Sequence, residues 1–318
     1  MVIQNAFKEK HRMLKGNLHM HTTRSDGTLT PEEAMRYYKQ HGYDFIAITD
    51  HRVYNSKNFL PEIGLTVIPG MEYDNGLNIP CDHGFRCFHT VCIGSDDAAK
   101  NGFEHDFRPG SAEARNQEEY QPYLDGIHAS GNLTIYCHPE WSSTPARYFD
   151  KMRGNVAMEI WNSGCVIDSD MDKDAPYWDE LLGMGVQLFG VATDDSHSTN
   201  DACHGWIMVN AENNVDSILE AIERGAFYSS CGPEIYDFRV EDGLIKIKCS
   251  PVKKIRLHSD GHYTMMKVAD DEELTYAEFP LKCADWIGNY AYVRLSVIDK
   301  DGKHAWTNPI FFYPYPEF

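Results

Sequence analysis

The sequence lacks any apolar stretch long enough to cross a membrane, and its first ten residues contain no apolar run of the kind that opens a secretory signal. Its nine cysteines are odd in number, and no two of them form a C-x-x-C pair. A disulfide framework needs an even set at regular spacing, so these cysteines are more typical of reduced, buried side chains. We therefore expect a cytoplasmic protein without a membrane span.

Positive charge is also scarce. Lysine and arginine number 29 against 48 aspartates and glutamates, which gives a formal net charge of −19. Such a surface repels nucleic-acid backbones and anionic lipid, so neither long nucleic acids nor membranes are expected as partners. A small phosphorylated substrate is still compatible with this charge, because bound cations can reverse the field inside a pocket.

The chain is long enough, at 318 residues, for one barrel-sized domain and a smaller module. From about residue 15 to residue 230, short apolar runs alternate with helical patterns. The expected strands are residues 44–49, 65–68, 88–93, 133–136, 156–160 and 186–191. This alternation is typical of a parallel sheet, and six or more such strands indicate a barrel or a large open sheet.

One helix is clearly marked near the start of this region. Thr30 is a good N-cap, Pro31 suits the first helical position, and Glu33 completes a capping box. Gly42 is placed to end the helix. Further along, the polar residues 98–121 predict an excursion over the rim of the fold.

The pattern changes after about residue 233. Residues 235–240, 244–248 and 290–297 alternate apolar and polar side chains, and Asp-Gly pairs at 242–243 and 301–302 supply turns. We expect a small antiparallel β-sandwich-like domain here. The predicted division is residues 1–232 for the α/β domain and residues 233–318 for the all-β domain.

Histidines and carboxylates recur at or near the ends of the predicted strands. These residues are His19, His21, Asp26, Asp50, His51, Glu72, His89, His138, Asp195 and His197. His19 and His21 are two apart, so in a strand both imidazoles would face the same side. Several of the set follow the C-terminal ends of strands, where parallel α/β barrels form their active sites.

These residue types point to a metal centre. Imidazole and carboxylate groups are the ligands that hold zinc, iron or manganese in proteins. The six histidines, together with Asp26, Glu72 and Asp195, exceed what one ion needs, and a carboxylate can bridge two ions. A hydroxide held between two such ions is suited to in-line attack at phosphorus.

Taken together and in this order, the motifs resemble the polymerase-and-histidinol-phosphatase (PHP) domain. The resemblance covers about residues 15–230 and includes Ser25-Asp26-Gly27, Thr49-Asp50-His51, Gly70-Met71-Glu72 and His138-Pro139. It implies a distorted (β/α)7 TIM-like barrel that holds two or three divalent ions. The segment 227–233, followed by a β module, is similar to the two-domain branch of that family.

The resemblance also implies which residues bind which ion. His19, His21, Glu72 and Asp195 would hold the first ion. Glu72 would bridge to a second ion, which His89 and His138 complete, with His83 as the alternative to His89. Asp26, His51 and His197 would hold the third. The mixture of histidine and carboxylate favours manganese or iron over zinc.

The expected catalytic residues are Asp50, Glu72 and His197. Asp50 is either the acid that protonates the leaving group or a residue that orients an imidazole. Arg24, Arg52 and Arg147 stand beside motif residues, so each is a candidate phosphate clamp or a solvated surface charge. Glu159 and Asn162 are expected to contact ligands, and Trp141 is a candidate for stacking on a ring of the substrate.

The sequence therefore predicts a metal-dependent phosphoesterase that cleaves a small, nucleotide-like phosphomonoester or phosphodiester. Cleavage of an amide, carbamate or carboxylic ester is the alternative, because hydroxide attacks carbonyl carbon as well. A non-catalytic metal-binding module is the third possibility, but such a domain would be expected to have lost ligands. The sequence allows a homo-oligomer without specifying one.

Overall fold

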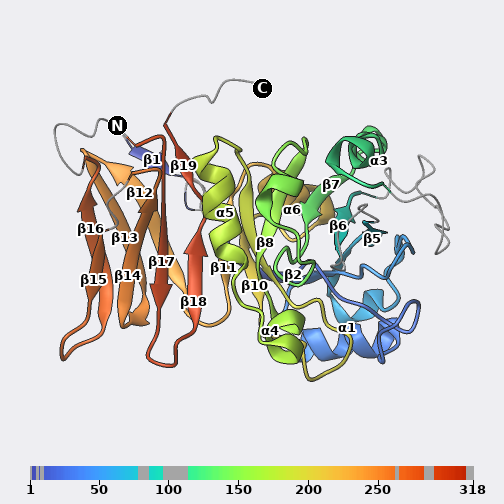
Figure 1. The fold of residues 1–318 in the computed structure, drawn as a ribbon. Coiled ribbons are helices and arrows are strands. Elements are labelled where there is room, and N and C mark those ends of the chain that lie inside the picture. Colours follow the sequence, from blue (N-terminus) through green and yellow to red (C-terminus); the bar gives the residue numbers. More distant parts are fainter. Residues whose placement is uncertain are drawn as a thin grey trace.

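The computed structural model describes residues 2–4, 7, 11–77, 86–95, 114–261, 265–282 and 290–312. Its helices gather in the N-terminal two thirds of the chain, while the C-terminal third is built of strands (Figure 1). The helices are α1 (Pro31–Gln40), α3 (Gln117–Ala129), α4 (Ser163–Ser169), α5 (Asp174–Gly183) and α6 (Val215–Glu223). None of the helices in these ranges is both long and apolar enough to cross a membrane.

A five-stranded sheet forms one half of the α/β region. Its order is β5 (Gly70–Gly76), β6 (Cys87–Ile93), β7 (Leu133–Tyr136), β8 (Asn155–Asn162) and β9 (Phe189–Thr193). Strands β7, β8 and β9 run parallel, as the alternating pattern predicts. Strand β6 is antiparallel to both of its neighbours, which corrects the expectation of a parallel sheet. The connection at 77–86 explains this, because a parallel crossover needs a dozen or more residues.

A ten-stranded sheet holds the other half and continues into the C-terminal region (Figure 1). Its α/β part contains β2 (Met13–Asn17), β3 (Phe45–Ala47), β4 (Thr66–Ile68), β10 (Trp206–Asn210) and β11 (Phe227–Ser230). Its C-terminal part contains β14 (Lys254–Ser259), β15 (Met266–Val268), β17 (Tyr292–Ile298) and β18 (His304–Thr307), with β19 (Ile310–Phe311) beside β17. Because β11 pairs with β18, one sheet runs through both regions.

The second sheet of the C-terminal region has four strands. These are β1 (Val2–Gln4), β12 (Ile235–Glu241), β13 (Leu244–Val252) and β16 (Leu274–Pro280), in that order. Its apolar side chains, Phe238 and Ile247 among them, share one core with Ile255 and Leu295 of the ten-stranded sheet. This packing is sandwich-like, as the sequence predicts. Strand β1 joins it from the opposite end of the chain.

The two sheets of the α/β region do not close into the predicted barrel within the described residues. They bury a common core, to which Leu14 and Phe45 contribute from one sheet and Ile135 and Val191 from the other. Among the described residues, isolated β-bridges connect the two halves at Met20–Ser196, His51–Glu72 and Asn55–Gly70. Pro69, which lacks an N–H group, separates β4 from β5 at one of these seams.

Helix α1 confirms its predicted start. The Thr30 side chain accepts a hydrogen bond from the Glu33 backbone N–H, and the Glu33 carboxylate accepts one from the Thr30 backbone N–H, so the capping box is complete. Gly42, with φ of 80°, follows the helix as expected. Helix α3, by contrast, begins at Gln117, inside the segment predicted as a rim excursion. Residues 98–113 of that segment lie outside the described ranges.

Candidate metal centre

The strand ends bring the nine predicted ligands to one place. His19 and His21 follow β2, His51 follows β3, Glu72 lies on β5, His89 lies on β6, His138 follows β7, and Asp195 and His197 follow β9, with Asp26 on the loop after His21. Backbone hydrogen bonds hold the ends of β2 and β9 together. The Asp195 N–H donates to the His19 carbonyl at 2.9 Å, and the His21 N–H donates to the Ser196 carbonyl at 2.8 Å.

Two of these residues have strained backbones. His138 has φ of 26° and Asp195 has φ of 49°, in the left-handed region that residues other than glycine rarely adopt. Strain of this kind persists only where the surrounding contacts over-determine it, and it gathers at functional sites. Both residues carry a side chain into the cluster described next.

Glu72 is the centre of the cluster. Its side chain is buried, and five imidazoles surround its two oxygens. Oε1 lies 2.9 Å from His89 Nδ1 and 3.4 Å from His138 Nε2. Oε2 lies 3.0 Å from His51 Nδ1, 3.4 Å from His21 Nε2 and 3.5 Å from His19 Nε2.

Asp195 is the second carboxylate of the cluster. Its Oδ1 lies 3.0 Å from His21 Nε2 and 3.1 Å from His19 Nε2. Those two Nε2 atoms are themselves 3.2 Å apart. Two imidazoles and a carboxylate therefore direct their polar atoms at one small volume.

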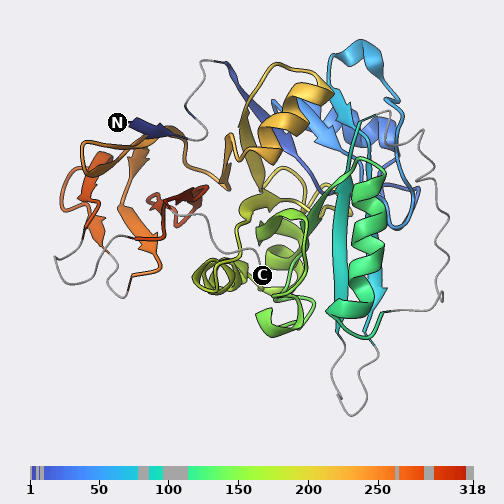
Figure 2. The same ribbon diagram turned by 90° about the horizontal axis from the view of Figure 1, so that it is seen from above.

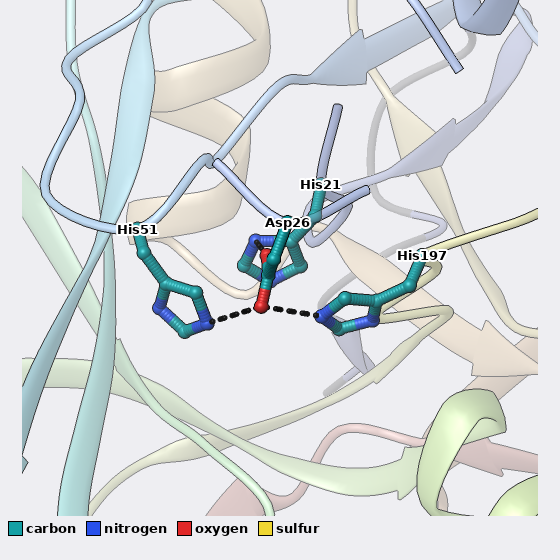
Figure 3. A group of neighbouring side chains, drawn as sticks. All are labelled: His21, Asp26, His51 and His197. Atoms are coloured by element: carbon teal, nitrogen blue, oxygen red, sulfur yellow. Dashed lines mark ion pairs between the residues drawn. The ribbon is translucent and has the colours of Figure 1, made fainter. Parts of the chain in front are cut away.

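Asp26 organises an outer group at the mouth of the site. One of its oxygens lies 3.6 Å from Nε2 of both His51 and His197, which flank it on either side (Figure 3). His21 Nδ1 is 3.5 Å from its other oxygen. The side chains of Asp26 and His197 are partly exposed to solvent, so this group faces outward.

Without a cation, the histidines have to carry the positive charge that balances these acids. Burial alone would lower the pKa of His51, but Glu72 and Asp74 raise it to about 10. Burial likewise opposes protonation of His197, whose pKa is raised to about 9 by Asp26 and Asp195. Burial would raise the pKa of Glu72, yet His89, His19 and His51 hold it well below its usual range. The site is therefore built for positive charge at its centre.

The donor set fits divalent metal ions. Ligand atoms within 4.8 Å of one another occur in four groups among the described residues. Three of them resemble the three implied ion positions: His19, His21 and Glu72; Glu72, Cys137 and His138; and His21, Asp26, His51 and His197. The fourth group is His19, Cys137 and Glu159. His51 Nδ1 is buried and lies 3.0 Å from Glu72 Oε2 and 3.6 Å from Asp74 Oδ1, so it has acidic oxygens as its neighbours. Imidazole nitrogen and carboxylate oxygen suit zinc, manganese and iron.

Cys137 is a neighbour of the cluster that the sequence analysis did not single out. Its sulfur lies near Glu72 and His138 because it directly precedes His138 at the end of β7. Burial raises the pKa of this thiol well above its usual range. The thiol also donates to the Ile135 carbonyl at 3.4 Å, so it has a hydrogen-bond partner within the fold. The alternative ligand His83 lies outside the described residues.

Asp50 is buried beside the cluster and reaches the imidazole of His21 through Ser25, whose hydroxyl lies 3.3 Å from His21 Nδ1. Its carboxylate accepts hydrogen bonds from the Thr22 backbone N–H at 2.7 Å, the Ser25 hydroxyl at 2.9 Å and the Asn55 side chain at 2.8 Å. These contacts hold the loop that carries Asp26. The position favours a structural role over that of an acid at the leaving group.

The three candidate phosphate clamps are engaged elsewhere. Arg24 donates to the Asn55 side chain, and Arg52 donates to Asp74 Oδ1 at 2.8 Å. Arg147 is exposed and lies over the ring of Tyr148, 5.0 Å from its centroid. None of the three is among the described residues that line the cavity at the cluster. Adjacency to a motif in sequence did not predict the direction of these side chains.

That cavity has a volume of about 290 Å³. One side is formed by the cluster, through Asp26, His51, Glu72, His89, His138, Asp195 and His197. The other side is formed by Trp141 and by Gly164, Cys165, Asp168 and Ser169 of helix α4. The Trp141 ring lies 5.0 Å from the His138 ring and is 37% exposed, so it is open to a ligand.

Comparison with known proteins agrees with this arrangement. The sequence matches the family model of the PHP domain over residues 17–293, and the chain therefore belongs to the PHP domain family. The match extends beyond the α/β region into the C-terminal strands. No curated protein matches the sequence.

Two solved structures are similar in fold. One is a two-domain protein from Bacteroides vulgatus containing a "predicted PHP-like metal-dependent phosphoesterase", with 16% identity, a TM-score of 0.49, and coverage of 97% of this chain and 98% of that one. The other is an amidohydrolase from Chromobacterium violaceum with bound sulfate, with 15% identity, a TM-score of 0.39, and coverage of 58% and 88%.

Proposed function

We propose that this protein is a metal-dependent hydrolase that cleaves a small phosphomonoester or phosphodiester. The observation that carries the proposal is the convergence of five imidazoles on the buried carboxylate of Glu72, with Asp195 against two of them. Histidines and acids in this density have little purpose in a folded core except to hold cations.

The ligands are proposed to hold two or three divalent ions, manganese, iron or zinc. His19, His21, Glu72 and Asp195 would hold the first, and Glu72, His89 and His138 would hold the second. Asp26, His51 and His197 serve the third, at the mouth of the cavity. When bound, such ions lower the pKa of a coordinated water to near neutrality and offset charge on phosphoryl oxygens.

The side chains around the cavity act on the substrate in different ways. Glu72 and Asp195 fix the geometry in which the phosphorus is approached. His197 and Asp26, at the open end, face the part of the substrate that leaves. Trp141 offers a ring face beside His138, which suits a base or another ring. Asp50 acts indirectly by holding the loop of Asp26.

The size of the cavity supports a small substrate. A volume of about 290 Å³ is at the lower end for ligand pockets. The net charge of −19 adds a further argument against long polyanions. We propose a compact phosphoester, one ring or less beyond the phosphate, as the class to test first.

The finer features of the fold and setting are also proposals. The two sheets of residues 1–232 represent an open, distorted form of a (β/α)7 barrel, and residues 233–318, together with β1, form the second domain. The seven described cysteines are all free, and six of them are buried, which suits the reducing cytoplasm.

A substrate panel tests the proposed chemistry. Protein loaded in turn with manganese, iron and zinc is assayed on phosphomonoesters, phosphodiesters, carboxylic esters, amides and carbamates. We expect hydrolysis of at least one phosphoester, lost on chelation and restored by metal. Turnover of amides, carbamates or carboxylic esters with none of any phosphoester would replace the proposal with the carbonyl chemistry.

A further inference from the structure

Glu159 on β8 is fully buried and accepts four hydrogen bonds within the site. Its Oε1 accepts from His19 Nδ1 at 2.7 Å and from the Thr193 hydroxyl at 2.6 Å. Its Oε2 accepts from the His138 backbone N–H at 3.0 Å and from the Asn162 side-chain amide at 2.9 Å. Every donor is itself buried, so this carboxylate is compensated by the protein alone.

The four donors lie on different parts of the sheet system. His19 follows β2, His138 follows β7, Thr193 ends β9, and Asn162 ends β8 itself. Asn162 also donates to Asp195 Oδ2 at 3.0 Å. One carboxylate is therefore connected to three of the proposed ligands, two directly and Asp195 through Asn162.

We propose that Glu159 is the positioning residue of the metal centre. By accepting from Nδ1 of His19, it fixes the tautomer in which the His19 Nε2 lone pair faces Glu72 and Asp195. By accepting from the His138 N–H, it stabilises the left-handed backbone of that residue, whose φ is 26°. The ligand side chains are thereby held in position before any ion binds, which lowers the free-energy cost of binding.

The geometry distinguishes this role from direct ligation. Glu159 lies on the Nδ1 side of the His19 ring, whereas Glu72 and Asp195 lie on the Nε2 side. The two nitrogens of an imidazole point in different directions, so an ion on Nε2 is out of reach of Glu159. Glu159 is also absent from the described residues that line the cavity.

The test is the metal affinity of a Glu159→Gln variant, measured by calorimetric titration with Mn²⁺ and with Zn²⁺. Glutamine keeps the shape but presents an amide to two of the four donors. We expect the affinity to fall by about 10–100-fold, as for other outer partners of ligating histidines. Wild-type affinity in this variant would overturn the proposal.

Asp174→Asn is the matched control. Asp174 is another buried carboxylate, with 1% exposure, and it accepts a hydrogen bond at 2.9 Å from the N–H of Glu140, which is not a proposed ligand. We expect this variant to bind metal as the wild type does. An equal loss of affinity in both variants would attribute the Glu159 effect to general destabilisation and overturn the specific role.

A measurement on the wild-type protein covers the case in which Glu159→Gln does not fold. In the zinc-loaded protein, ¹H–¹⁵N correlation spectra of labelled histidine should place the His19 proton on Nδ1. A proton on Nε2 would contradict the proposal. These experiments require metal binding but no substrate, so a failed substrate panel and a failed role for Glu159 can be told apart.

Discussion

Two buried polar clusters in this molecule balance their charges in opposite ways. At the junction between α5 and the C-terminal strands, Arg294 of β17 is fully buried and stacks 4.4 Å from the Trp178 ring. Its Nε donates to Asp179 Oδ1 at 2.9 Å, and its Nη2 lies 3.1 Å from His258 Nδ1. The junction therefore carries its own cation, whereas the described lining of the metal centre contains no lysine or arginine.

The pKa values of the histidines in the two clusters show this contrast. At the junction, burial and Arg294 lower the pKa of His258 to about 4, so it stays neutral. At the metal centre, burial also opposes charge, but Glu72 and Asp74 raise the pKa of His51 to about 10. The same residue type shifts in opposite directions because its charged neighbours differ in sign. The junction balances its charges with its own side chains, although Arg294 Nη1 is buried without a hydrogen-bond partner among the described residues. The metal centre, by our proposal, needs added cations to balance its acids.

Removal of two proposed ligands is expected to have the largest effect on metal binding and activity. A protein with His19→Ala and His21→Ala should lose bound metal and hydrolysis together, by more than the about 10–100-fold that changing an outer partner costs. Elemental analysis and initial rates provide the measurement. His41→Ala, an exposed histidine at the end of α1, serves as the control. Full metal content in the double variant would refute the assigned ligands.

Chelation should separate the two clusters without any mutation. Ligands that bind only the folded state add about 4 kcal/mol per site at a thousandfold excess over the dissociation constant. Metal-loaded protein should therefore unfold at a clearly higher temperature than protein treated with a chelator, as measured by calorimetry. Identical unfolding temperatures would mean that the folded centre gains nothing from metal.

Breaking the junction should reduce stability whether metal is present or not. Asp179→Asn leaves the buried guanidinium of Arg294 without its counter-charge, which costs about 3 kcal/mol. Denaturant unfolding of the chelated protein measures this loss of stability. Glu119→Gln, which breaks an exposed pair with Arg115, should change little. An Asp179→Asn protein as stable as the wild type would show that the junction pair contributes nothing.

The smallest effect is the pH dependence at the junction. The pKa of His258 is about 4 in the folded protein, below the ordinary value of 6.5, so the unfolded chain takes up the proton first as the pH falls. The free energy of unfolding falls between pH 6.5 and 4, by at most about 1.4 kcal/mol per pH unit. In chelated protein, the free energy of unfolding of the His258→Gln variant should depend less steeply on pH between pH 6.5 and 4. Equal slopes for wild type and variant would contradict the lowered pKa.

The meeting of the histidines and acids was easier to predict from the sequence than the sheets were, and their binding of metal stays a prediction. The ligand positions follow from strand ends, and strand ends are visible where apolar runs stop at His51, His138 or Asp195. An apolar run does not reveal its direction, so the antiparallel setting of β6 was not predictable. Nor was the pairing of β1 with β12, because it joins residues far apart in the chain.

The direction of individual side chains was the second feature that the sequence did not predict. Arg24, Arg52 and Arg147 were chosen as neighbours of motif residues, and the structure turns Arg24 and Arg52 toward Asn55 and Asp74. Glu159 was visible as an acid near the end of a strand, but its four hydrogen bonds depend on four separate strand ends meeting. Such contacts are set by tertiary packing and leave no local pattern.

Anomalous X-ray diffraction from crystals grown with manganese tests the central claim most directly. We predict two or three anomalous peaks, with one between His19, His21 and Asp195, one beside His89 and His138, and any third at Asp26. Crystals with no peak within reach of Glu72, despite excess metal, would contradict the assignment of this cluster as a metal centre.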